Sequence, residues 1–199
     1  MKIGVPRDYY IHPGYTCRMD NQAFDDTPFT DEYQKGVYLF AREICDRDGL
    51  KSVCDIGCGS GYKLMANFHD LDTVGLELAR TWQFLTAKWP ERRWEVSDLD
   101  GPITLSKEMV ISADVIEHLT HPDKFLQYIL NMSPKQIVLS TPEREMAFGV
   151  TDGPPKNVHH VREWNFDEFG AYIGSWFEIE RHFVCDEHTQ VVLCHVKQR

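Results

Sequence analysis

The sequence lacks any long apolar run, and this absence argues against a membrane-spanning helix. No stretch of the 199 residues approaches the roughly 18 to 20 consecutive apolar side chains that a helix needs to cross a bilayer. The segment that begins at Met1 carries charge but no apolar core, unlike a secretory signal peptide. We therefore expect neither a membrane span nor a leader.

Positive charge is also scarce. The chain has 21 Lys and Arg against 31 Asp and Glu, a formal net charge of −10, and its densest basic spot is Arg92-Arg93. Phosphate backbones are attracted by clustered cations. The composition thus argues against a long nucleic-acid partner and leaves a short one open.

The six cysteines form no Cys-x-x-Cys pair, and two of them fall in predicted buried strands. This pattern favours reduced thiols in a cytoplasmic protein over a disulfide framework or a zinc knuckle. The length predicts one domain with a substantial core.

Residues 1–30 show no clear periodicity and are rich in Pro, Gly, Asp and aromatics, so we predict an irregular arm. Its aromatic side chains either form a lid over a site or pack the arm against the sheet; they are Tyr9, Tyr10, Tyr15 and Phe24. From Thr30, a candidate helix cap, apolar residues recur at helical spacing. We assign residues 31–199 to a single domain.

Strands and helices alternate through that domain. The predicted strands are 52–56, 73–77, 93–97, 109–113, 136–140, 177–184 and 189–196. The predicted helices between them are 62–68, 80–88, 122–132 and 167–176. This alternation predicts an α/β fold with a doubly wound, mostly parallel sheet and a closing antiparallel hairpin.

A glycine-rich turn follows the first strand, at Gly57, Gly59 and Gly61. A dinucleotide motif needs its third glycine where this chain has Tyr62. Asp55 at the strand end would repel a pyrophosphate, whereas it suits a ligand with an ammonium and a sulfonium, such as S-adenosylmethionine (SAM). Bare backbone at the glycines would let the amino-acid part of SAM lie close.

Two more acids end the next two strands. Glu77 follows Asp55 by 22 residues, and Asp98 closes the third predicted strand. Ligands bind beyond the carboxyl ends of parallel strands, so these acids are expected to lie together. Glu77 can accept hydrogen bonds from both ribose hydroxyls, and Asp98 from the adenine amino group.

These segments resemble the class I SAM-dependent methyltransferases over roughly residues 35–196. Asp55 to Gly61 looks like their first motif, Gly75-Leu-Glu77 like the second and Ser97-Asp98 like the third. The resemblance implies a seven-stranded sheet and SAM as cofactor. The residues we then expect at the donor site are Asp55, Gly57, Cys58, Gly59, Glu77, Leu78, Asp98, Leu99 and Asp114.

On the acceptor side, Asp114, Glu117 and His118 would share one face of a helical turn after the fourth strand. With His159 or His160, they offer carboxylates and imidazoles to a divalent metal such as Mg, Mn or Zn.

The pattern of these residues resembles small-RNA terminal 2′-O-methyltransferases and, in its first half, O-methyltransferases of ubiquinone synthesis. The former implies Asp114, Glu117, His118 and His160 as ligands, with Asp standing where that family usually has Glu. His118 or His160 as a metal-free general base remains the alternative. Arg144 and Arg162 either bind an anionic group near the cleft or are ordinary surface residues.

The reaction predicted from these residues is O-methylation of a small molecule, sugar or glycan. Methylation of RNA ends or of an amine, and a non-catalytic SAM-binding subunit, stay open. The sequence does not indicate the oligomeric state.

Overall fold

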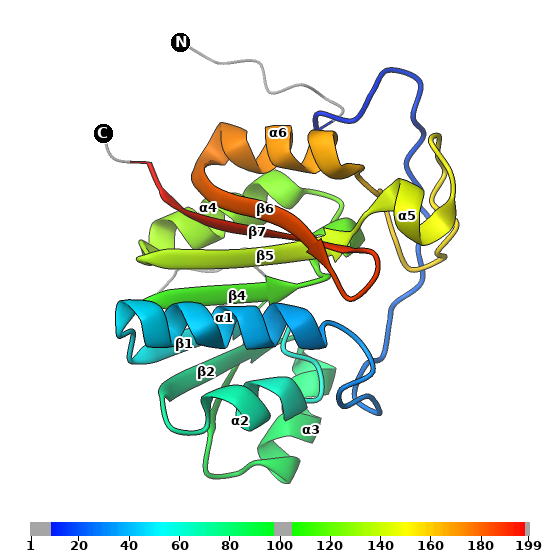
Figure 1. Cartoon of the computed structure of the whole chain (residues 1–199). Coiled ribbons are helices and arrows are strands. Elements are labelled where there is room, and N and C mark those ends of the chain that lie inside the picture. The colour runs from blue at the N-terminus through cyan, green and yellow to red at the C-terminus, as the bar shows by residue number, and fades with distance from the viewer. Residues whose placement is uncertain (1–8, 98–104, 198–199) are drawn as a thin grey trace.

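The computed structural model describes residues 9–97 and 105–197 of the chain. Their strands form one sheet in the order β3-β2-β1-β4-β5-β7-β6 (Figure 1). The first five strands in the chain are β1 (Ser52–Ile56), β2 (Asp72–Glu77), β3 (Arg93–Val96), β4 (Met109–Ala113) and β5 (Gln136–Pro142). These five run parallel.

The sheet ends in an antiparallel pair, β6 (Phe177–Cys185) and β7 (Thr189–Val196), and β7 also pairs antiparallel with β5. The predicted fold class is therefore confirmed: a seven-stranded, mostly parallel sheet with a C-terminal hairpin.

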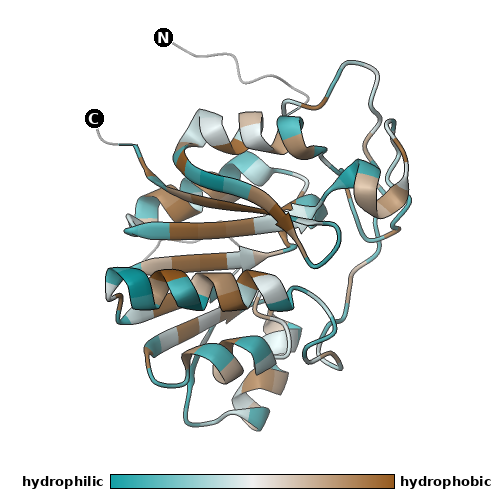
Figure 2. Cartoon of the chain, viewed as in Figure 1, coloured by the Kyte–Doolittle hydropathy of each residue, from teal (hydrophilic) through white to brown (hydrophobic). Residues whose placement is uncertain are grey.

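Helices cover both faces of the sheet. One core cluster joins it to α1 (Lys35–Asp48), α2 (Tyr62–Phe68) and α3 (Ala79–Lys88). The other joins it to α4 (Pro122–Met132) and α6 (Phe166–Trp176). Figure 2 shows hydrophobic residues, in brown, along the central strands, as expected for strands buried on both sides.

One local prediction was wrong, and one helix was not predicted. The first helix begins at Lys35 and not near Thr30, because Gln34 has a left-handed backbone (φ 59°) and the amide of Thr30 is bound by Glu32 Oε2 at 2.6 Å. The short helix α5 (Arg144–Phe148) was not predicted. Glu143 caps α5 by accepting a hydrogen bond from the amide of Met146 at 2.6 Å.

The described part of the arm, residues 9–34, contains no helix or strand. In Figure 1 it passes along the edge where the parallel strands end and then leads into α1. Among the described residues, no helix is both long and apolar enough to cross a membrane. All six cysteines are free thiols in the structure.

Candidate functional site

A cavity of about 1050 Å³ opens at the carboxyl ends of the parallel strands. Its wall includes Gly57 and Glu77 on the donor side, and His118 and His160 on the acceptor side. The arm supplies a second wall between Asn21 and Gln34. This volume is at the upper end of the range for small-molecule sites.

The glycine turn lies after β1, and its glycines have left-handed backbones. Their φ angles are 77° at Gly57 and 55° at Gly59, a conformation that residues with a Cβ rarely adopt. A Cβ at Gly57 would overlap the side chain of Val115. The amide of Gly59 donates to Glu77 Oε1 at 2.8 Å, which ties the turn to the end of β2.

Asp55 lies beneath this turn and does not line the cavity. The hydroxyl of Tyr38 donates to its Oδ2 at 2.9 Å, while its Oδ1 is buried without a hydrogen-bond partner. Burial is the main cause that raises the pKa of Asp55 to about 7, and the carboxylates of Glu77 and Asp26 raise it further. The site therefore contains a buried acid with one oxygen that no protein group satisfies.

Glu77 lines the cavity from the end of β2. Its second oxygen accepts the amide of Leu78 at 2.9 Å. Burial raises the pKa of Glu77 to about 7, against the lowering effect of the two amides. Leu78 is 65% exposed and lies on the same wall, where an apolar ligand surface would cover it.

The remaining predicted donor residues are placed differently. Cys58 is buried against Gly75 and does not line the cavity. Asp98 and Leu99 lie outside the described residues. Asp114 lines the cavity with a left-handed backbone (φ 54°). Its carboxylate is tied by Ser140 Oγ at 2.6 Å and by Gln34 Nε2 at 3.1 Å.

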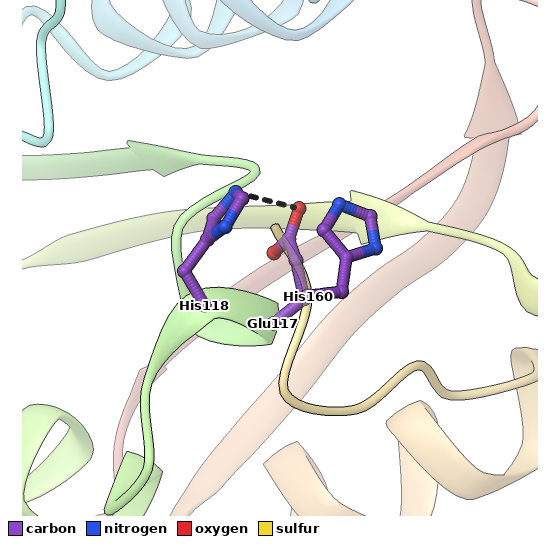
Figure 3. A group of neighbouring side chains, drawn as sticks. All are labelled: Glu117, His118 and His160. Atoms are coloured by element: carbon purple, nitrogen blue, oxygen red, sulfur yellow. Dashed lines mark ion pairs between the residues drawn. The ribbon is translucent and has the colours of Figure 1, made fainter. Parts of the chain in front are cut away.

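On the acceptor side, three of the four predicted metal ligands come together. Ligand atoms of Glu117, His118 and His160 lie within 4.8 Å of one another (Figure 3). Glu117 and His118 come from the short 3-10 turn Ile116–His118, and His160 comes from the loop before α6. Asp114 is not part of this group, because Ser140 and Gln34 engage its two oxygens.

Glu117 is fully buried. Thr141 donates to its Oε2 at 3.0 Å, but its Oε1 has no hydrogen-bond partner. This Oε1 faces Nε2 of His118 at 4.0 Å. Burial and then Asp114 raise the pKa of Glu117 well above its ordinary value.

Each histidine of the group is oriented through its other ring nitrogen. His118 Nδ1 lies 2.8 Å from the carbonyl oxygen of His159, and His160 Nδ1 lies 2.8 Å from Glu163 Oε1. Burial, followed by the neighbouring His160, lowers the pKa of His118 to about 4, so its approach to Glu117 is not an ion pair at neutral pH. If each Nδ1 carries the proton, both Nε2 atoms hold lone pairs, and such outer hydrogen bonds are typical of metal-binding histidines.

Three residues around the site were not predicted as functional. Asp26 of the arm lines the cavity beside Gly59. Asn157 Nδ2 lies 3.0 Å from His160 Nε2, and Glu163 orients the same ring. For Glu163 the sequence held a signal, namely a carboxylate three residues after His160.

The two arginines expected near the cleft are neither anion-binding nor surface residues. Arg144 is 1% exposed and donates to Glu168 Oε2 at 2.7 Å. Arg162 donates to the carbonyl oxygens of Leu119 and Thr120, at 2.6 and 3.1 Å. The terminal nitrogens of both side chains therefore hold loops together, although the Nε atom of each is buried without a hydrogen-bond partner.

The aromatic side chains of the arm divide between the two expected roles. Tyr9 packs on Tyr172 and under the guanidinium of Arg162, so it fixes the arm to the domain. Phe24 is 50% exposed and lines the cavity, with its ring nearly parallel to that of His118 at 6.3 Å between centroids.

No protein-family model and no curated protein matches this sequence. Solved structures do match. Magnesium protoporphyrin IX methyltransferase from Synechocystis PCC 6803, with bound S-adenosylhomocysteine (SAH), has a TM-score of 0.64 at 15% identity, over 83% of this chain and 84% of that chain.

Two further structures are similar. N-methyltransferase NodS from Bradyrhizobium japonicum WM9, in complex with SAH, has a TM-score of 0.64 at 12% identity, over 88% of this chain and 94% of that one. Mitomycin 7-O-methyltransferase MmcR has a TM-score of 0.59 at 16% identity, over 81% of this chain and 54% of that one. The fold of this chain is therefore that of the class I SAM-dependent methyltransferases.

Proposed function

We propose that this chain, which has the class I methyltransferase fold, is a SAM-dependent methyltransferase that methylates a hydroxyl group of a small-molecule or glycan acceptor. One observation carries the proposal. A single cavity is lined at one end by the glycine turn and Glu77, and at the other by Glu117, His118 and His160.

The donor side fits SAM in shape and charge. The positive φ at Gly57 and Gly59 leaves bare backbone for the amino-acid part of the donor. Glu77 lines the cavity, and each of its oxygens accepts one amide and has a further lone pair available for a ribose hydroxyl. Burial raises the pKa of Asp55 and of Glu77, so two poorly solvated acids lie at this end of the site, and the ammonium and sulfonium of SAM would supply positive charge beside them.

The reaction is an in-line displacement. The acceptor oxygen forms a bond to the methyl carbon while the carbon–sulfur bond breaks and its electron pair passes to sulfur, which gives SAH. The hydroxyl proton must leave during or after this step. His160 is the candidate base, because Glu163 Oε1 at 2.8 Å from Nδ1 orients the ring, and Nε2 would exchange its 3.0 Å contact with Asn157 Nδ2 for the hydroxyl proton.

The same residues fit a divalent metal. Glu117 Oε1 is an orphaned buried oxygen beside two imidazoles whose outer nitrogens are already engaged. Mixed nitrogen and oxygen ligands suit Zn or Mn. A bound ion would be held by Glu117, His118 and His160, and it would lower the pKa of an acceptor hydroxyl.

A thermal-shift titration tests both parts of this proposal. SAH is added with and without Mg, Mn or Zn to the wild type, to His160→Ala and to His159→Ala, whose ring lies outside the three-residue group. Stabilisation by SAH is expected in every variant, because binding to the folded state raises Tm. No stabilisation of the wild type would overturn the SAM-binding assignment.

The titrations with metal ions have their own outcomes. A metal-dependent rise in Tm that is lost in His160→Ala and kept in His159→Ala supports the three-ligand site, and directs the substrate search to catechols and vicinal diols. If no metal changes Tm in any variant, the metal site is refuted, and His160 remains as the base for a hydroxyl or an amine.

A further inference from the structure

The arm contributes a carboxylate to the donor side of the cavity. Asp26 is half-buried and lines the cavity with Phe24 and Phe29 from the same segment. A Cβ built on Gly59 would overlap the carboxylate of Asp26. The acid thus lies directly against the bare backbone of the glycine turn.

In the part of the chain that the structure describes, Asp26 forms no ion pair with a cationic side chain. Within the described residues, no hydrogen bond joins its carboxylate to another residue, and Lys63 acts on it only at longer range. Burial is the main cause that raises its pKa, and Asp25 adds to the effect. A charged group held in this way indicates a missing partner of opposite charge.

Two other acids lie nearby: Glu77 lines the same cavity, and Asp55 is buried beneath the glycine turn. The carboxylate of Asp26 raises the pKa of both Asp55 and Glu77 by like-charge repulsion. Lys63 lowers the pKa of Asp55, but it does not neutralise all three acids. Independently of this cluster, the fully buried Oδ1 of Asp55 lacks any hydrogen-bond partner.

We propose that Asp26 is a donor-binding residue supplied by the arm, and that its carboxylate binds the ammonium group of the amino-acid part of SAM. The inference rests on the proposed function. The ammonium is chosen over the sulfonium because Asp26 lies against the bare backbone of Gly59, the turn at which the proposed function puts the amino-acid part of the donor. The arm then covers the donor and is fixed by it.

The test compares two ligands that differ in the group concerned. SAH carries the ammonium, and 5′-methylthioadenosine has the same nucleoside and thioether without any amino-acid part. Their dissociation constants are measured by calorimetry for the wild type, Asp26→Asn and Asp26→Glu. Asp20→Asn is the matched control, because its side chain is 88% exposed on the same arm.

We expect Asp26→Asn to weaken SAH binding at least about tenfold, the scale of a hydrogen bond to a charged group, and to leave 5′-methylthioadenosine unchanged. Asp26→Glu should restore part of the loss, and Asp20→Asn should match the wild type. A merely structural role for Asp26 would weaken both ligands equally.

Other results would overturn the inference. Unchanged SAH binding in Asp26→Asn would show that Asp26 does not contact the donor. Tighter binding of SAH would show that Asp26 occupies the donor's place and must leave it. Failure of the wild type to bind either ligand would instead refute the proposed function itself.

Discussion

At the scale of single residues, the acceptor side depends on side chains that orient other side chains. His160 is 3% exposed, and its position is set by Glu163 at Nδ1 and by Asn157 at Nε2. Glu163 does not line the cavity, so any effect of Glu163 on a ligand bound there must pass through His160.

The first prediction concerns Glu163→Gln. Loss of the carboxylate should release the orientation of the His160 ring and weaken metal binding about tenfold or more, with SAH affinity unchanged. The measurement is the metal-dependent shift in Tm. Glu178→Gln is the matched control, because Glu178 faces His195 at 3.5 Å in an exposed pair on the hairpin. Equal metal responses in the two variants would contradict the positioning role.

The second prediction concerns Asp55→Asn. The folded-state pKa of Asp55 is about 7 against an ordinary value of 3.8. A raised folded-state pKa gives stability that is present below the ordinary value and lost as the pH rises through the folded value. The free energy of unfolding of the ligand-free wild type should therefore fall between about pH 4 and pH 7.

Asn keeps an oxygen for the Tyr38 hydroxyl but cannot ionise, so the variant should lose stability less steeply over the same range. Denaturant titrations at several pH values measure the slope of the free energy of unfolding against pH. This slope does not depend on any pH-independent cost of the substitution. Asp20→Asn should retain the wild-type slope. Parallel slopes for Asp55→Asn and the wild type would show that Asp55 does not titrate in this window.

At the scale of elements, α6 holds together the loop that carries His160. Asn165 caps the helix and forms a capping box with Glu168. Glu168 also accepts Arg144 Nη1 at 2.7 Å, and both side chains are buried. One carboxylate thus caps α6 and neutralises a buried guanidinium.

The third prediction follows from these two roles. Asn165→Ala should cost about 1 kcal/mol of unfolding free energy, as for other caps. Glu168→Ala should cost about 3 kcal/mol or more, because it also removes the close partner of the buried Arg144, whose other carboxylate partner, Glu145, lies at 3.9 Å. Urea denaturation of both variants measures the difference. Equal costs would mean that the Arg144 contact contributes nothing beyond the cap.

Regular elements could be predicted from the sequence because local patterns determine them. Pro122 marks the start of α4. The strand bounds predicted from the apolar runs differ from those in the structure by at most two residues at either end. The start of α1 at Lys35 could not be predicted, since it depends on Glu32 and on the backbone of Gln34. The glycine turn was found because its chemistry is contiguous in the sequence.

The rest of the site depends on contacts distant in sequence. Asp26 meets Gly59 only because the arm crosses the ends of the strands, and no periodicity in residues 1–30 indicates that path. Asp114 was expected to be a metal ligand from its spacing and from the resemblance to small-RNA 2′-O-methyltransferases. Its bonds to Ser140 and Gln34 arise from the pairing of β4 with β5 and from the position of α1, which spacing cannot show.

At the scale of the whole molecule, the donor side is a place where folding leaves like charges close together. Asp26, Asp55 and Glu77 meet from the arm, β1 and β2, with Lys63 of α2 as the nearby cation. Folding of the ligand-free chain therefore becomes less favourable as these acids ionise. A ligand with an ammonium group removes that cost, because it favours the ionised acids.

The fourth prediction is that stability and donor binding change in opposite directions with pH. Between about pH 5.5 and 8, ionisation of Asp55 and Glu77 through pKa values near 7 should lower the Tm of the ligand-free protein and raise the affinity for SAH. The stabilisation by a fixed SAH concentration should thus grow with pH. The stabilisation by 5′-methylthioadenosine, which has no ammonium, should grow less with pH. Thermal-shift series with both ligands across this range make the comparison. An SAH-induced shift that shrinks as the pH rises would mean that no cationic group binds beside these acids.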